Sequence, residues 1–156
     1  MKFKKLESGR SMVEMLGVLA IIGVLSVGGI AGYSLSMRRH RANGVVDILS
    51  KYALVAYSNC QQKLLNREVT SISECVTDST HLVPYFENAG LGDEPAGVDA
   101  IVINSIRTDP TSGADIIAVS AEFDNDKLCQ AVASISGTKC IVDGGHGFIK
   151  VNFKQN

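Results

Sequence analysis

The sequence contains one long uncharged run, from Met15 to Met37. An α-helix rises 1.5 Å per residue, so a helix of about 23 residues is roughly 35 Å long. This length exceeds the thickness of the hydrocarbon core of a bilayer, which is roughly 30 Å. The run therefore predicts a transmembrane helix. Basic residues flank both ends of it, so charge alone does not orient the helix: Lys2, Lys4, Lys5 and Arg10 precede it, and Arg38, Arg39 and Arg41 follow it.

Glu14 places a carboxylate immediately before this run. A carboxylate at the centre of a bilayer helix costs on the order of 2.5 to 3.5 kcal/mol on insertion scales, so it requires a compensating group. Two interpretations are open. Glu14 lies in the headgroup zone, or a positive charge on another chain offsets it.

The residues before Glu14 form a short basic head, M-K-F-K-K-L-E-S-G, which ends in Gly9. Glu14 is the fifth residue after that glycine. Together with the apolar run, this arrangement resembles the leader of type IV prepilins and type II secretion pseudopilins, and the resemblance covers residues 1–37. It implies that a prepilin peptidase cleaves between Gly9 and Arg10 on the cytoplasmic side. It also implies that Arg10 is N-methylated and that Glu14 neutralises the new N-terminal amine of a neighbouring subunit.

The chain departs from the family pattern at two points. Arg10 stands where the family usually has Phe, Met or Leu, and the apolar run lacks the proline that many members carry. The run is instead rich in glycine, and each helix glycine costs about 1 kcal/mol relative to alanine. Gly23, Gly28, Gly29 and Gly32 could therefore weaken the helix at this point. The alternative is that Gly28 and Gly32 form a G-x-x-x-G contact face for another helix.

Cysteine usage places the rest of the chain in an oxidising compartment. Cys60, Cys75, Cys129 and Cys140 all follow the apolar run, and an even number of cysteines in a small head predicts disulfides. Three connectivities are possible, of which Cys60 with Cys75 and Cys129 with Cys140 gives the shortest loops. The pilin resemblance favours the C-terminal Cys129–Cys140 loop.

The remaining pattern predicts an α+β fold. Apolar residues recur at helical spacing as far as Leu64, so one helix is expected from about Ser11 to Leu65, with an amphipathic second half. Ile/Val-rich segments predict strands at Ala100–Ile106, Asp115–Phe123 and Gly147–Phe153. A short helix is expected between the last two strands, capped by Asp124 or Asn125. Between the long helix and the first strand, the S-x-x-E at Ser71 to Glu74 predicts a capping box, and Pro84 to Gly90 predicts a helical turn.

The expected architecture is thus a long N-terminal transmembrane helix with a small pilin-like head. In the head, an antiparallel sheet of three or more strands packs on the C-terminal half of that helix. The domains are a prepilin leader (1–9), a transmembrane and filament-assembly helix (10–37) and a periplasmic or extracellular head (38–156).

No catalytic set, cofactor site or metal site is predicted. The sequence lacks G-x-S-x-G, phosphate-loop and H-E-x-x-H motifs, and a site that joins His81 or His146 to the thiols lacks C-x-x-C spacing.

The alternation of Glu122, Asp124 and Asp126 is a weak match to a calcium loop, and helix capping explains it better. The D-G-G-H-G at Asp143 to Gly147 could bring His146 near a carboxylate, but a glycine-rich turn accounts for it. The acidic residues Asp93, Glu94 and Asp99 are expected to be solvated.

The predicted function is therefore structural rather than enzymatic: a subunit of a type IV pilus or pseudopilus-like filament. The implied location is the bacterial inner membrane, with the N-terminus cytoplasmic and the head periplasmic, and then the pilus or pseudopilus. The implied partners are prepilin peptidase, identical or related pilin subunits, the inner-membrane assembly machinery and the lipid bilayer, without direct contact to nucleic acid. The main alternative is a single-span membrane protein with a periplasmic binding or enzymatic head. A secreted protein with a signal peptide cleaved near Ala31 is disfavoured by Glu14 and by the length of the run.

Overall fold

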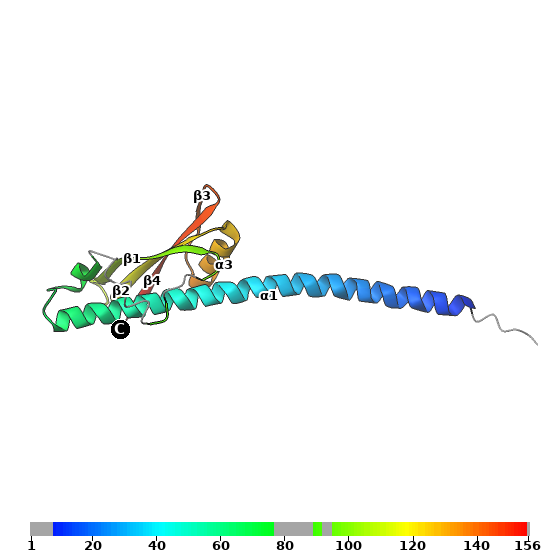
Figure 1. The fold of residues 1–156 in the computed structure, drawn as a ribbon, viewed down its shortest axis with the longest axis horizontal. Helices are drawn as coiled ribbons and strands as arrows, with labels where there is room; N and C mark the ends of the chain where they lie inside the picture. Colours follow the sequence, from blue (N-terminus) through cyan, green and yellow to red (C-terminus); the bar gives the residue numbers. More distant parts are fainter. Residues whose placement is uncertain (1–7, 77–88, 92–94, 156) are drawn as a thin grey trace, which may run out of the picture. The chain divides into compact units, whose positions relative to one another are not determined.

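The computed structural model describes residues 8–76, 89–91 and 95–155 (Figure 1). The chain divides into two compact units, Met1–Arg38 and Arg39–Asn156. A single helix, α1 (Ser8–Leu65), begins in the first unit and ends in the second, so the long helix expected from the sequence is confirmed. Several positions singled out in the sequence lie outside the described residues: Lys2, Lys4, Lys5, His81, Pro84, Asp93 and Glu94.

The second unit is an α+β head with a four-stranded antiparallel sheet in the order β1-β2-β4-β3. Its elements after α1 are η1 (Ile72–Val76), β1 (Val98–Thr108), β2 (Asp115–Phe123), α3 (Asp126–Ser136), β3 (Ile141–Asp143) and β4 (His146–Gln155). The three predicted strands and the short helix are confirmed, and β1 and β4 are longer than expected. The short strand β3 was not predicted, and Cys140 is the residue immediately before it.

One face of the sheet packs on the second half of α1 and forms the core. Along β4, the side chains alternate between buried Ile149 and Val151 and exposed Phe148 and Lys150, as the period of two requires. The helix contributes residues at three- and four-residue steps, which places them on one stripe. The buried stripe consists of Ala42, Val45, Leu49, Tyr52, Ala53, Ala56 and Cys60, in one cluster with Ile103, Ile106, Ile117, Val119, Ala121, Phe123, Ile149 and Val151.

A carboxylate joins this half of α1 to the sheet. The Tyr57 hydroxyl donates to Asp115 Oδ2 at 2.9 Å, and the Thr108 hydroxyl donates to Asp115 Oδ1 at 2.8 Å. The hydrogen bond to Asp115, together with partial burial, raises the pKa of the Tyr57 hydroxyl. Asp115 therefore connects the helix, β1 and β2 at one end of the sheet.

The short helix α3 begins as the sequence predicts, with one correction. Asn125 is the N-cap, and its side chain accepts from the Leu128 backbone N–H at 2.9 Å. Glu122 belongs to β2 and takes no part in the cap, so helix capping does not explain its position. Before η1, the Glu74 carboxylate accepts from the Thr70 backbone N–H at 2.9 Å and also from Ser71, the partner that the predicted capping box gives it.

Both cysteine pairs with the shortest loops are disulfides. Cys60 is bonded to Cys75 with a Cα–Cα distance of 5.5 Å, and Cys129 is bonded to Cys140 with a Cα–Cα distance of 5.8 Å. The first connects the end of α1 to η1, and the second connects α3 to the residue before β3. Cys60 and Cys129 are fully buried, so each disulfide is part of the core.

Two glycine features explain the D-G-G-H-G motif. Gly144 and Gly145, with φ of 58° and 92°, form the two-residue turn between β3 and β4, a turn that requires positive φ at both positions. Gly147 passes so close to the second disulfide that an added Cβ would lie 2.7 Å from Cys129 Sγ and 3.3 Å from Cys140 Sγ. The glycine-rich turn is confirmed, and Gly147 is required by the close packing of β4 on the disulfide.

Gly147→Ala should therefore destabilise the head by about 1 to 3 kcal/mol, the usual cost of overpacking a close contact. Urea unfolding of the detergent-solubilised chain, followed by circular dichroism, would measure the change. Gly44→Ala is the control, because an added Cβ at Gly44 has nothing within 4 Å. Equal stability of the Gly147→Ala and Gly44→Ala variants would contradict the proposed contact.

Candidate functional site

The first half of α1 is an exposed apolar surface. From Met12 to Met37 every side chain is exposed, and an 18-residue window of α1 has a mean hydropathy of 2.2 with none of its residues buried inside the structure. Exposed apolar surface of this extent marks a membrane or protein contact. The hydrophobic residues of this surface are exposed to between 37% and 74%: Met12, Val13, Met15, Leu16, Val18, Leu19, Ile21, Ile22, Val24, Leu25, Val27, Ile30, Tyr33, Leu35 and Met37.

This stretch of α1 is long and apolar enough to span a membrane. Two of its serines satisfy their hydroxyls within the helix: Ser26 Oγ donates to the Ile22 carbonyl at 2.7 Å, and Ser34 Oγ donates to the Ala31 carbonyl at 2.9 Å. Such bonds remove much of the cost of placing a hydroxyl in hydrocarbon. The serines are therefore compatible with a bilayer.

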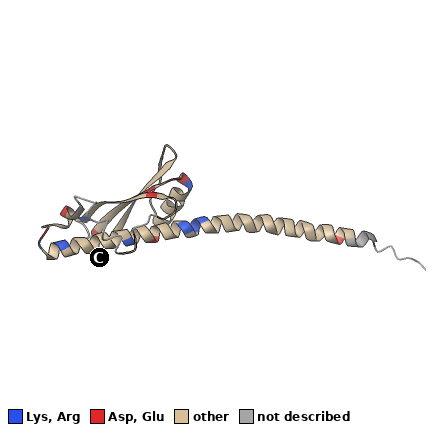
Figure 2. Ribbon diagram, viewed as in Figure 1, with Lys and Arg blue, Asp and Glu red and all other residues tan. Residues whose placement is uncertain are grey.

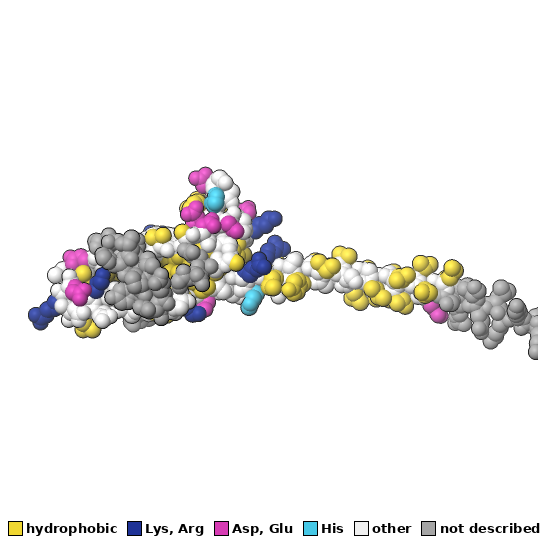
Figure 3. Space-filling model, in the orientation of Figure 1, with side chains coloured by type: hydrophobic (Ala, Val, Ile, Leu, Met, Phe, Trp, Pro, Cys, Tyr) yellow, Lys and Arg dark blue, Asp and Glu magenta, His cyan; other side chains and the backbone are white. Residues whose placement is uncertain are grey.

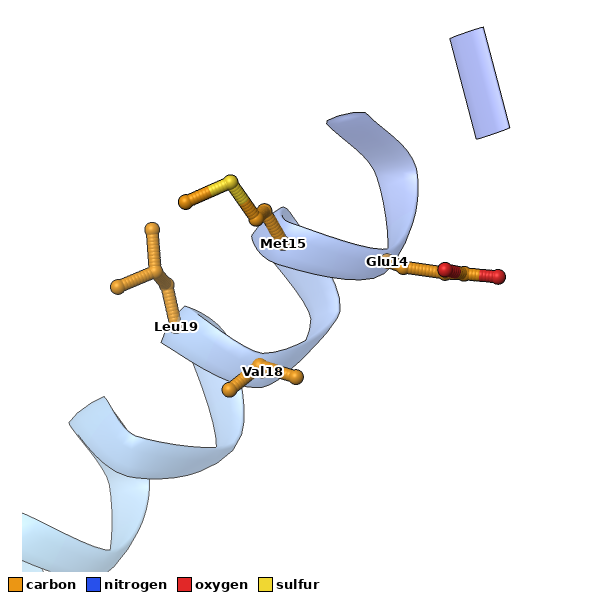
Figure 4. Close-up of a pocket in the computed structure, with 4 residues that line it drawn as sticks. All are labelled: Glu14, Met15, Val18 and Leu19. Carbon is orange, nitrogen blue, oxygen red and sulfur yellow. The ribbon is translucent and has the colours of Figure 1, made fainter. Parts of the chain in front are cut away.

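Glu14 is the exception in this surface. In Figure 2 the stretch is tan apart from an acidic position near its start. The hollow next to Glu14 is lined by Met15, Val18 and Leu19, all from adjacent turns of the same helix, so it is an open surface and not an enclosed pocket. Figure 4 shows the carboxylate projecting away from Met15 and Leu19. Among the residues that the structure describes, Glu14 has no hydrogen-bond or ion-pair partner.

Glycines in this half of α1 have no neighbour that requires them. An added Cβ at Gly17, Gly23, Gly28, Gly29 or Gly32 would meet nothing within 4 Å. Successive residues are rotated by about 100° around the helix axis. Gly32 therefore lies at about the same angular position as Glu14, and Gly28 lies about 40° from it. Since each glycine costs about 1 kcal/mol of helix propensity, nothing near them in the described structure explains their presence. One face of the helix thus combines the carboxylate with the G-x-x-x-G pair.

The other site residues expected from the sequence are only partly placed. Gly9 and Arg10 lie in the first turns of α1, and their side chains lie outside the description. The four cysteines are all in disulfides, which excludes them as free thiol ligands.

The structure also brings together three residues that the sequence analysis did not combine: Asp99, Glu122 and His146. His146 Nδ1 lies 3.4 Å from Asp99 Oδ2 and 3.9 Å from Glu122 Oε1. The D-G-G-H-G motif indicates that His146 could lie near a carboxylate. The partners could not be named, because they come from two other strands.

No family model matches the chain, and neither a curated protein nor a solved structure matches it significantly.

Replacing both Gly28 and Gly32 by Leu should reduce self-association of the chain in detergent, because bulky side chains prevent close approach of two helix backbones. Head stability should not change, since neither glycine has a neighbour within 4 Å. Analytical ultracentrifugation would measure association, and circular dichroism would measure stability. Ile30→Leu, on the opposite helix face, is the control. Unchanged association of the Gly28→Leu/Gly32→Leu variant would instead favour the interpretation that these glycines weaken the helix.

Proposed function

We propose that this chain is a structural subunit of a type IV pilus or pseudopilus-like filament, made as a membrane-anchored prepilin and polymerised through the first half of α1. The observation that carries the proposal is Glu14: one carboxylate on a helix surface that is otherwise uncharged from Met12 to Met37. An isolated membrane anchor gains nothing from such a residue. A helix that packs against copies of itself gains a specific electrostatic contact.

The physical role of Glu14 follows from its position near the start of the helix. In the proposed filament, removal of residues 1–9 creates an N-terminal amine at Arg10, and the carboxylate of one subunit lies beside the amine of the next. The amine and the helix N-terminus are both positive, so a carboxylate placed there is stabilised by both. Inside an apolar bundle, breaking such a buried pair costs about 3 to 5 kcal/mol.

The same apolar surface would serve two environments in turn. Before assembly it would span the bacterial inner membrane, where the lipid tails cover it. After extraction by the assembly machinery, the same side chains would pack in the centre of the filament. The face that carries Glu14, Gly28 and Gly32 is suited to this contact, because small residues allow helix backbones to approach closely.

The second unit supports an extracytoplasmic head. Its two disulfides require an oxidising compartment, which is the periplasm or the exterior for a bacterial protein. The antiparallel sheet packed on the second half of α1 is consistent with the layout of a pilin head. Prepilin peptidase would act on the opposite, cytoplasmic side, at the bond between Gly9 and Arg10.

Gly9→Val should block removal of the leader, because the proposed peptidase requires a small residue before the cleaved bond. The variant should remain in the membrane at full length, while the matched variant Ser8→Ala should be processed normally. Immunoblots of membrane fractions, with mass spectrometry of the N-terminus, would distinguish the two forms. Normal trimming of the Gly9→Val precursor would show that the leader is wrongly assigned.

Glu14→Leu should separate anchoring from assembly. The variant should insert at least as well as the parent, because it removes a charge from the apolar segment. It should be cleaved normally and yet form no filaments when it is the only copy, because the buried amine loses its partner. Electron microscopy of sheared surface material, with membrane immunoblots, would show both results.

Met15→Leu is the matched control, since it changes the neighbouring side chain and keeps the surface apolar. This variant should form filaments like the parent. Normal filaments from Glu14→Leu would contradict the proposed role of the carboxylate. Absence of filaments from the parent under assembly conditions would favour the anchored binding or enzymatic module instead.

A further inference from the structure

We propose that Asp99, Glu122 and His146 form a binding site for a divalent transition-metal ion, with Zn²⁺ as the reference ion. The three residues come from β1, β2 and β4, which are neighbours in the sheet. One potential ligand atom from each lies within 4.8 Å of the others. Figure 3 shows acidic side chains gathered around a histidine at the β3–β4 end of the head.

The backbone brings the three side chains to one place. β1 carries an irregularity between Val98 and Ala100, whose partners Phe123 and Glu122 are consecutive, so Asp99 is the extra residue of a β-bulge. A bulge redirects a side chain relative to regular pairing. Glu122 pairs with Phe148, two residues beyond His146, which makes Glu122 and His146 diagonal neighbours within reach of long side chains. His146 itself follows the Gly144–Gly145 turn and is the first residue of β4.

The separations of the ligand atoms are closer to those of a metal site than to those of a hydrogen-bonded ion pair. A charge-assisted bond between nitrogen and a carboxylate is about 2.7 to 2.9 Å long. His146 Nδ1 lies 3.4 Å from Asp99 Oδ2 and 3.9 Å from Glu122 Oε1, so neither contact has that geometry. Two ligands at about 2.05 Å from a tetrahedral Zn²⁺ are about 3.3 Å apart. The first separation already matches this value, and the second requires a small side-chain movement.

The ligand chemistry selects the class of ion. One imidazole nitrogen with two carboxylate oxygens is a donor set that Zn²⁺ accepts, and three protein ligands leave the fourth tetrahedral position open to water. Ca²⁺ and Mg²⁺ prefer oxygen ligands alone and more of them. The side chains of Asp99, Glu122 and His146 are 43%, 39% and 52% exposed, so an ion can enter from solvent. A bound ion would link β1, β2 and β4 on the face of the sheet opposite α1.

The test uses the full chain in detergent, freed of metal with EDTA and kept without reductant so that both disulfides persist. Calorimetric titration with ZnCl₂ should give one Zn²⁺ per chain. Saturating Zn²⁺ should raise the unfolding temperature, because the ion binds the folded state. His146→Gln and Glu122→Gln should each weaken Zn²⁺ binding by at least about tenfold and remove the thermal shift.

Matched controls come from the other two histidines of the chain. His40→Gln and His81→Gln should bind Zn²⁺ like the parent, and Ca²⁺ should bind the parent more weakly than Zn²⁺. The proposal is overturned if the parent binds no Zn²⁺ at about 1 mM. It is equally overturned if Zn²⁺ binding is unchanged in both His146→Gln and Glu122→Gln, or if Ca²⁺ binds more tightly than Zn²⁺.

Discussion

The exposed apolar surface of the first half of α1 is the constraint on which the rest of the account depends. Side chains from Met12 to Met37 are exposed in the isolated chain, and such a surface is stable only when lipid or protein covers it. Glu14 helps to distinguish a lipid cover from a protein cover. The hydrocarbon tails of lipid can cover the apolar side chains, but they do not supply a partner for a carboxylate. The proposed filament of packed helices would supply both the cover and the partner.

The two halves of α1 differ in how apolar and charged side chains are distributed around the helix, because they have different surroundings. The first half is apolar on all sides, as expected of a helix surrounded by apolar material. In the second half, the buried stripe that includes Val45, Leu49 and Ala56 faces the sheet, and Asp47 and Lys51 form an exposed ion pair at 2.7 Å. The surroundings of the glycines also differ between the apolar half of α1 and the head. Those of the apolar half have no neighbour within 4 Å, whereas Gly147 in the head is tightly packed against a disulfide.

Much of the fold could be predicted from the sequence, because its strongest signals are local. Helical spacing predicted α1, alternation predicted β4, and Asn125 marked the start of α3. Strand β3 has only three residues, Ile141–Asp143, which is too few to show a period. It forms because the Gly144–Gly145 turn folds the chain back on β4, and this Gly-Gly pair is the local signal from which a hairpin could have been predicted.

The two candidate sites also differ in whether a local sequence signal identifies them. Glu14 could be identified from the sequence, because its signal is a charge in an uncharged run. The cluster of Asp99, Glu122 and His146 could not, since each residue is more than twenty positions from the next along the chain. Only the pairing register and the bulge at Asp99 bring them together. Each of the three alone has an ordinary explanation as a solvated or turn residue.

The central claim is that α1 is an assembly helix released from a short leader, and the intact mass of the protein extracted from its native membrane tests this most directly. Without reductant, the mass should correspond to a chain from Arg10 to Asn156 with two disulfides and at most one added methyl group. A full-length mass beginning at Met1, or a mass corresponding to cleavage near Ala31, would contradict the account.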